Sequence, residues 1–295
     1  RAVANLSNAQ TQGSSRFGRV IIYTLLGLVC LYYLMPLFVM VSTSLKTLDD
    51  IRTGNLISLP SQVTFEPWQE AWSSACIGVR CEGMSVYFWN SFRFVIPAVL
   101  ITTIVGAFNG YVLTMWRFKG SDMFFTALMI GCFIPFQVVL LPMAKTLGML
   151  GIANSIVGLI FVHVIYGLAF TTLFFRNYYI SIPDELVKAA KIDGAGFLRI
   201  FWRIILPLST PIIVVSIIWQ FTQIWNDFLF GVVFSSGDRQ PVTVALNNLV
   251  NTSTGVIGYN VDMAAAIIAA LPTLFVYIVA GKYFVRGLTA GAVKG

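Results

Sequence analysis

Charged residues are scarce in this sequence. Only 11% of its 295 residues are Asp, Glu, Lys or Arg, whereas soluble domains carry about 25%. The mean hydropathy is +0.82. Too few polar side chains remain to cover a water-soluble globule of this length, so the composition excludes an ordinary soluble domain and indicates an integral membrane protein.

Groups that carry catalysis are also scarce. The one histidine, His163, stands in an apolar run without a neighbouring cysteine or carboxylate, so we expect a packed, hydrogen-bonded histidine and no metal site. The stretch "AGKY" at 280–283 lacks the upstream glycine and the hydroxyl of a phosphate-binding loop. We therefore predict a chain that is not an enzyme and holds no cofactor of its own.

The sequence has four cysteines. Cys30 and Cys132 lie in apolar runs, where packing is the expected role. Cys76 and Cys81 bracket the stretch "CIGVRC". Two interpretations stay open for this pair: a small disulfide formed in an oxidising compartment, or two free thiols.

Long apolar runs take the place of the missing charge. Six of them come close to the roughly 20 residues that cross a bilayer; they cover about 20–44, 89–115, 123–143, 155–175, 204–234 and 263–284. Because a spanning segment must satisfy its own backbone polar groups, we predict an all-α membrane protein with six transmembrane helices. Pro135 and Pro142 predict kinks in the third run.

The basic residues orient these runs. Of the 19 Lys and Arg, thirteen fall on the side of the N-terminus and six on the other. The positive-inside rule therefore places both termini in the cytoplasm. The formal charge of +7 follows from this topology, so nucleic acid is not an expected partner. Membrane lipid is.

The segments between the runs define the expected organisation. Residues 1–15 form a cytoplasmic tail, and residues 16–295 form one six-span domain. Its connecting segments are an outer loop at 46–88, an inner segment at 176–203, a second outer loop at 235–262 and a C-terminal tail at 285–295. An ion-coupled secondary transporter often shows an internal repeat and several intramembrane carboxylates, and this sequence shows neither.

The inner segment contains the polar stretch "DELVKAAKIDGAG". Pro183, Asp184 and Glu185 suit the first turn of a helix, which Ser181 can cap. We predict that this helix runs to Ile192, that Gly194 ends it with a left-handed residue, and that a new helix follows. The helix either lies on the chain's own inner face or presents Ala189 and Ala190 to a partner.

Polar and aromatic side chains inside the runs are candidates for a translocation pathway, because polar groups are costly in lipid. The candidates are Asn109, Tyr111, Gln137, Trp219, Gln220, Gln223, Asn226 and Asp227, with Trp225 as a further ring that could stack on a sugar. Gln220, Gln223 and Asp227 would share one face of a continuous helix. The alternative for each residue is hydrogen bonding between helices.

The polar stretch resembles the coupling motif of permease subunits in binding-protein-dependent ABC importers. That motif is Glu-Ala-Ala, three residues, Gly, nine residues, then Ile-x-Leu-Pro. This chain has Ala189-Ala190, Gly194 and Ile204 with Leu206-Pro207 at those spacings, although Lys188 replaces the glutamate.

Other stretches extend the resemblance over nearly the whole chain. They are "MPLFVMVSTSLK", "NSFRF", "YVLTMWRFKG", "WNDFLF" and the terminal "GLTAGAVKG". Together they resemble the second permease subunit of maltose-type carbohydrate importers, and most closely permeases for glucose or mannose.

The resemblance implies a type I ABC importer permease fold in a bacterial inner membrane. It implies coupling to an ATPase through Asp184, Glu185, Lys188, Ala189, Ala190, Asp193, Gly194 and Ala195. It assigns Ala290, Gly291 and Lys294 to a tail that contacts the ATPase, and Asn251, Thr252, Ser253, Thr254 and Gly255 to a loop that contacts a binding protein.

The same resemblance implies the partners. They are a second permease subunit, two copies of an ATP-binding subunit that holds ATP and Mg²⁺, and a periplasmic sugar-binding protein. The implied substrate is a monosaccharide such as glucose or mannose. A maltose-like oligosaccharide and glycerol phosphate stay open as alternatives.

Overall fold

The computed structural model describes residues 16–251 and 258–292. Within these ranges all regular structure is helical, apart from an isolated bridge between Ile77 and Arg80. The predicted all-helical class is therefore confirmed. The chain divides into two compact units: residues 1–68 with 258–264, and residues 69–257 with 265–295.

The first unit is built from α1 (Arg16–Ser44), α2 (Leu48–Thr53) and the beginning of α14 (Tyr259–Ala292). Lys46 is buried where α1 ends, and its Nζ donates to Ser58 Oγ at 3.0 Å. Asn260 Nδ2 donates to the Lys46 carbonyl at 3.0 Å. Hydrogen bonds from Ser61 lower the pKa of the partly exposed Asp50 carboxyl. These polar contacts, rather than a large apolar core, stabilise the segment that follows α1.

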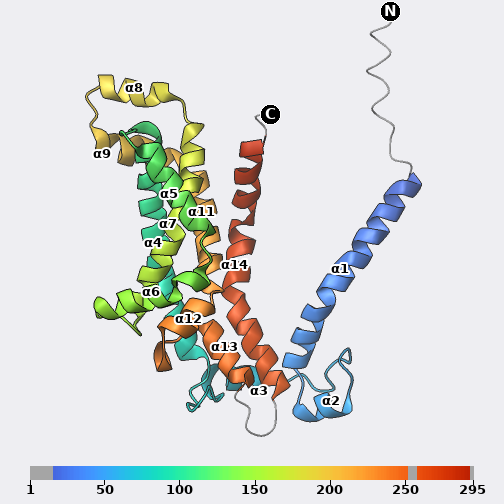
Figure 1. Ribbon diagram of the computed structural model, residues 1–295. Helices are drawn as coiled ribbons and strands as arrows, with labels where there is room; N and C mark the ends of the chain where they lie inside the picture. The colour runs from blue at the N-terminus through green and yellow to red at the C-terminus, as the bar shows by residue number, and fades with distance from the viewer. Residues whose placement is uncertain (1–15, 252–257, 293–295) are drawn as a thin grey trace, which may run out of the picture. The chain divides into compact units, whose positions relative to one another are not determined.

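The second unit is centred on α4 (Ser85–Met115) and α7 (Ile156–Ile180), which lie side by side (Figure 1). Gly106 and Gly110 on α4 let the two helices approach closely, as small residues do in membrane helix pairs. A Cβ atom added to Gly110 would lie 2.7 Å from the Cβ of Phe175. Beside this contact, Asn109 Nδ2 donates to Thr172 Oγ1 at 3.3 Å.

Two of the predicted spans are not single helices. The run 123–143 forms α5 (Ser121–Phe133) and α6 (Phe136–Met149), bent by 104°. The break falls at Pro135, which lacks a backbone N–H, whereas Pro142 lies inside α6 without interrupting it. Among the described residues, four helices are long and apolar enough to span a membrane alone, and the total is six if each bent pair forms one span.

The second bent pair follows α8 (Asp184–Ile192). It begins with α9 (Phe197–Ile200), a π-helical turn (Phe201–Ile205) and α10 (Leu206–Leu208). It then turns by 77° into α11 (Thr210–Trp225). The predicted fifth span, 204–234, was therefore too long, because the helix ends at Trp225.

Shorter helices occupy the loops. They are α3 (Glu66–Ser73), α12 (Leu229–Phe234), the 3-10 turn η2 (Gly237–Arg239) and α13 (Val242–Asn251). The predicted loop 235–262 thus contains a helix, and the predicted tail 285–295 continues α14 as far as Ala292.

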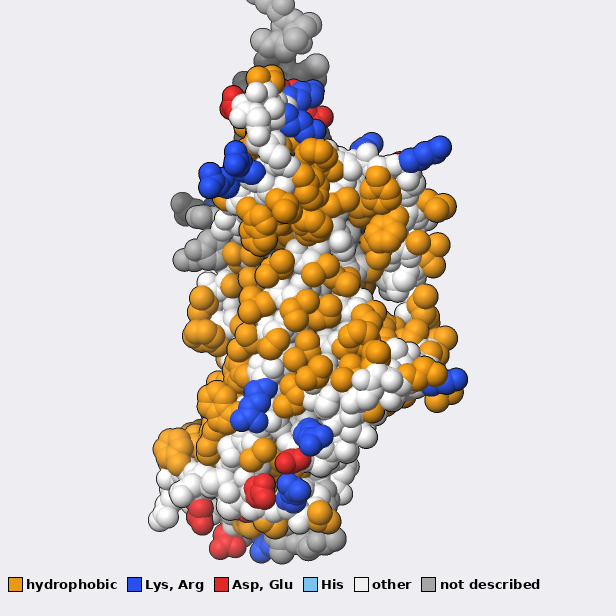
Figure 2. Space-filling view, turned by 90° about the vertical axis from the view of Figure 1, so that its left-hand side faces the viewer, with side chains coloured by type: hydrophobic (Ala, Val, Ile, Leu, Met, Phe, Trp, Pro, Cys, Tyr) orange, Lys and Arg blue, Asp and Glu red, His pale blue; other side chains and the backbone are white. Residues whose placement is uncertain are grey.

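Within the second unit, α8 and the C-terminal end of α14 lie at one end, and α12 and α13 lie at the other (Figure 1). Figure 2 shows a broad apolar band between two ends that carry the charged side chains.

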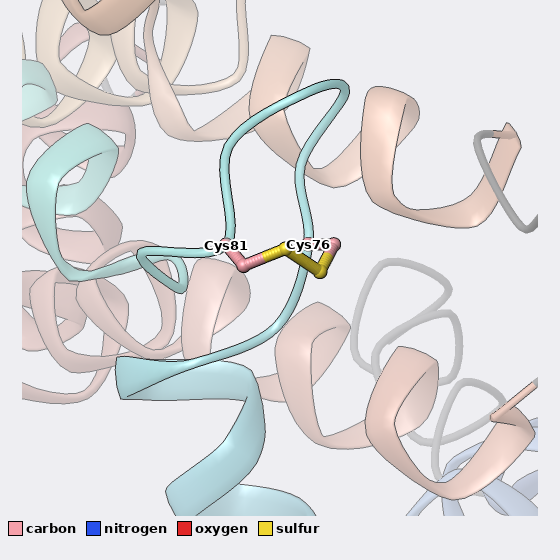
Figure 3. Close-up of a disulfide and its surroundings, with 2 residues drawn as sticks. All are labelled: Cys76 and Cys81. Carbon is pink, nitrogen blue, oxygen red and sulfur yellow. A yellow bond between two sulfur atoms is a disulfide. The ribbon is translucent and has the colours of Figure 1, made fainter.

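Cys76 and Cys81 form a disulfide in the loop after α3 (Figure 3). Their Cα atoms are 3.8 Å apart. Arg80, inside this covalent ring, lies 3.9 Å from the carboxylate of Asp238 in η2. The side chain of Asn90, near the start of α4, also donates to the Asp238 carbonyl. The ring is therefore connected to the same end of the unit as α12 and α13.

Candidate functional site

A cavity of about 330 Å³ lies inside the second unit. Its walls come from the α5–α6 break, from α7, from the end of α11 and from α12. The lining residues are Cys132, Ile134, Phe136, His163, Tyr166, Gly167, Phe170, Trp219, Gln220, Gln223, Ile224, Asp227 and Phe230. A mostly apolar wall with a few polar groups is typical of sites for small organic ligands.

Aromatic rings make up much of the cavity wall. Phe230 on α12 packs edge-on against Tyr166 and His163 of α7, with ring centroids 5.1 Å and 5.5 Å away. Trp219 on α11 packs against Phe170 and Phe174 of α7, at 6.2 Å and 5.9 Å. These contacts join α7 to α11 and α12, and Tyr166, Phe170, Trp219 and Phe230 all line the cavity.

Asp227 lies just before the first turn of α12, which begins at Leu229. Its carboxylate accepts the backbone N–H of Gly231 at 3.1 Å and of Phe230 at 3.4 Å. Its carbonyl accepts the Thr243 hydroxyl at 2.6 Å. The predicted shared helix face of Gln220, Gln223 and Asp227 was wrong, because α11 ends at Trp225. All three nevertheless reach the same cavity.

His163 and Gln220 supply the buried polar groups of the wall. Gln220 Nε2 donates to the Gly167 carbonyl at 3.2 Å and so ties α11 to α7. His163 is buried and stacks on Phe94, as predicted for a packed histidine. Its Nε2 makes no hydrogen bond with any described residue, contrary to the prediction, and lies 3.8 Å from the Asp227 carboxylate.

Of the eight predicted pathway residues, four line the cavity: Trp219, Gln220, Gln223 and Asp227. Asn109 bonds between α4 and α7, Tyr111 is fully buried beneath α8, and Gln137 and Asn226 are exposed elsewhere. Trp225 is also buried, and its Nε1 donates to the Ala269 carbonyl at 2.9 Å. Asn109, Tyr111 and Trp225 therefore connect helices instead of lining the cavity.

Several lining residues carried no distinctive signal in the sequence. Phe136, Tyr166, Phe170 and Phe230 are aromatic residues in apolar runs, where such residues are common. Pro135 was the available clue, since it predicted a kink, and the break there brings Ile134 and Phe136 to the cavity wall. The bend angle that places them there cannot be read from a proline alone.

The segment 184–196 forms the predicted helix. It ends in a Schellman motif, with Gly194 at φ +76°, the Ala195 N–H donating to the Ala190 carbonyl at 2.9 Å and the Gly194 N–H donating to the Lys191 carbonyl at 3.1 Å. The predicted cap was wrong: Pro183 precedes the helix, and Ser181 instead closes α7 by donating to the Tyr178 carbonyl. The next helix begins at Phe197, as predicted.

Helix α8 has an inner and an outer face. Val187 and Ala190 are only 5% and 7% exposed and pack into the chain's own core. Of the two alternatives, Ala190 therefore follows the first, since it packs on the chain itself, whereas Ala189 is exposed and free for the second. The outer face carries a protruding apolar side chain, Ile192, at 86% exposure. The other predicted coupling residues Asp184, Glu185, Lys188, Asp193 and Gly194 are exposed, and Ala195 is partly buried.

The remaining candidates lie at the ends of helices or beyond them. Asn251 is the last residue of α13, and its side chain donates to the Asn247 carbonyl at 2.8 Å. The backbone of Ala290 and Gly291 belongs to α14. The tail 1–15 and the candidates Thr252, Ser253, Thr254, Gly255 and Lys294 lie outside the described residues.

Comparison with known proteins gives a consistent result. A family model described as "Binding-protein-dependent transport system inner membrane component" matches residues 103–290. A probable ABC transporter permease protein of Pyrococcus horikoshii is 40% identical, over 94% of this chain and 98% of its own length. A xylose/arabinose import permease protein of Haloferax volcanii is 33% identical, over 93% of each chain.

A solved structure shares the fold. It is a bacterial ABC transporter involved in the import of the acidic polysaccharide alginate, and the matched chain superposes with a TM-score of 0.79. The match covers 92% of this chain and 98% of that chain at 21% sequence identity.

Proposed function

We propose that this chain, which belongs to the binding-protein-dependent transport system inner membrane components and among them to the permeases of carbohydrate-uptake ABC importers, forms half of a pathway for a small neutral sugar. The proposed substrate is a monosaccharide such as glucose or mannose. The chain contributes no chemistry of its own to the sugar. It binds the sugar, excludes other solutes and changes conformation.

The cavity is the observation that carries the choice of substrate. A pyranose presents one apolar C–H face and a rim of hydroxyls. Trp219 and Phe170 offer flat rings for such a face, and Gln223 and Asp227 offer hydrogen-bonding groups for the rim. The volume of about 330 Å³ suits a monosaccharide and is small for a longer oligosaccharide.

Charge argues against glycerol phosphate. Phosphate sites in proteins use Arg, Lys or helix N-termini. None of the described residues that line this cavity is Lys or Arg, and the wall carries the Asp227 carboxylate. A phosphorylated substrate would therefore meet a like charge instead of a cation.

The energy for transport comes, in this proposal, from separate subunits. The outer face of α8, with Glu185, Lys188, Ala189 and Ile192 exposed, supports docking on an ATP-binding subunit that holds ATP and Mg²⁺. A second permease completes the pathway, and a periplasmic sugar-binding protein delivers the sugar near Asn251 and the residues that follow it. Rigid-body movement of α8 then alters access to the cavity.

The proposed topology follows from the same assignment. We place α8 and the C-terminal end of α14 on the cytoplasmic side of a bacterial inner membrane, with both termini inside. The disulfide and α13 then face the periplasm. The arrangement of α8 and α14 at one end of the second unit supports this orientation.

Uptake by the complete complex tests the proposal. The two permeases, two ATP-binding subunits and binding protein are reconstituted in vesicles and offered labelled glucose, mannose, maltose and glycerol 3-phosphate. We expect ATP-dependent uptake of a monosaccharide in preference to the others. Preferred uptake of glycerol 3-phosphate or maltose would overturn the substrate assignment, and uptake by this chain alone under an ion gradient would overturn the importer assignment.

A further inference from the structure

Trp116 connects α8 to two neighbouring helices, α4 and α9. It directly follows α4, and the Lys191 ammonium of α8 lies over its ring, 4.1 Å from the centroid. The ring of Phe197, the first residue of α9, meets the indole edge-on at 5.0 Å. The indole N–H donates to the hydroxyl of Tyr111, one turn back on α4. One side chain thus contacts α4, α8 and α9.

Tyr111 extends this connection. Its hydroxyl donates to the Phe197 carbonyl at 3.1 Å, and the residue is fully buried. Around it lies an apolar cluster that joins α8 to α4 and α7; its buried members are Ala107, Tyr111, Phe175, Tyr179, Val187, Ala190, Ile200, Phe201 and Ile205. Helix α8 is therefore bound laterally to the ends of α4 and α7.

The chain that leads from α8 to α11 is not one continuous helix. Gly194 and Gly196 have open space around them, a π-helical turn follows at Phe201–Ile205, and the chain then bends by 77° before α11. Each interruption can absorb part of a displacement. Helix α4, in contrast, runs unbroken from Ser85 to Met115.

Helix α4 also reaches the cavity wall. The Thr102 methyl group lies against Gly167, which lines the cavity. The hydroxyls of Thr103 and Ser216 lie 3.4 Å apart and join α4 to α11. A displacement of α4 would therefore move its contact residues on both α7 and α11, close to the cavity wall.

We propose that Trp116 is a positioning residue for energy coupling: it fastens α8 to the end of α4, so that displacement of α8 passes first into the α4–α7 pair. Lys191 is its counterpart on α8. This inference rests on the proposed function of α8 as the helix that docks on the ATP-binding subunit.

Three variants of the complete reconstituted complex test the inference: Lys191→Gln, Lys191→Arg and Trp116→Leu. Uptake and ATP hydrolysis are measured in the same vesicles. We expect Lys191→Gln and Trp116→Leu to lower the sugar moved per ATP about fivefold, and Lys191→Arg to keep it, because a guanidinium also binds over an indole ring. Arg176→Gln is the matched control, since Arg176 of α7 lies 4.0 Å over the ring of Phe125 and so pairs with α5. Its transport ratio should stay unchanged.

The outcomes separate this inference from the function on which it rests. An unchanged ratio of sugar moved to ATP hydrolysed in Lys191→Gln would overturn the inference. If that ratio is unchanged because uptake and hydrolysis fall equally, Lys191 acts in docking alone. Failure of the ATP-binding subunit to co-purify with the unaltered chain would instead overturn the proposed function. If Trp116→Leu does not reach the membrane, Lys191→Gln decides, because Lys191 is exposed.

Discussion

At the scale of single residues, the polar groups of the cavity have more than one role. Asp227 caps α12 through two backbone N–H groups, and it also faces His163 across 3.8 Å. Truncation to alanine would remove both the cap and the charge. Asparagine keeps an oxygen for the cap and removes only the charge, so it isolates the contribution of the carboxylate to sugar binding.

We expect Asp227→Asn to raise the KM for the sugar about tenfold, because a hydrogen bond to a charged group contributes about 1.5–3 kcal/mol. Uptake kinetics in vesicles measure this change. Asn226→Ala is the control, since Asn226 is exposed and does not line the cavity. Unchanged kinetics in Asp227→Asn would assign the carboxylate to capping α12 alone.

Gly110 is the second residue that merits a direct test. Its α-carbon faces the Phe175 side chain of α7, where a Cβ would lie 2.7 Å from that residue's Cβ. We expect Gly110→Val to destabilise the chain by about 1–3 kcal/mol through overpacking. Thermal unfolding in detergent measures it. Gly131→Ala provides the comparison, since nothing lies within 4 Å of a Cβ there, and an equal effect of the two would refute the close-packing argument.

At the scale of elements, α8 shows what its sequence could and could not predict. Its extent and its end at Gly194 follow from local chemistry: helix-forming residues, acids in the first turn, and a glycine at φ +76°. Which alanine faces outward does not follow, because that depends on how Val187 and Ala190 meet α4 and α7.

Ala189 and Ala190 therefore make a matched pair. We expect Ala189→Arg, on the outer face, to leave the chain in the membrane and to reduce its association with the ATP-binding subunit at least about tenfold. Ala190→Arg would place a charge in the core, which costs several kcal/mol, and should lower the amount of folded chain. Co-purification and membrane yield measure the two effects. Full association in Ala189→Arg would remove α8 from the docking surface.

The broken spans mark the other limit of sequence reasoning. Hydrophobic runs located the four long apolar helices and the two bent pairs of the described residues. The run 204–234, however, continued past the true end of α11, because "FLFGVVF" after Asp227 is equally apolar. Nothing in that composition distinguishes a continuing helix from the separate α12. The same limit explains why Tyr111 was placed in the pathway: an aromatic residue in an apolar helix is equally compatible with a cavity and with a core.

At the scale of the whole molecule, the orientation in the membrane is the property to test. We expect Lys188→Cys to react with a membrane-impermeant thiol reagent only after cells are opened, and Leu59→Cys to react in intact cells, because the positive-inside rule places them on opposite sides. Both side chains are exposed. The background carries Cys30→Ser and Cys132→Ser. The reverse labelling pattern would invert the proposed topology.

The covalent ring at Cys76 and Cys81 has a consequence for biogenesis and handling. It can close only after its loop has met an oxidant, so a host that inserts the chain but lacks thiol oxidation outside the cytoplasm would produce it with Cys76 and Cys81 reduced. Purification buffers that contain dithiothreitol to protect Cys30 and Cys132 would open the same ring. Preparations made with and without reductant are therefore different chemical species, and their stability should be compared before either is used for structural work.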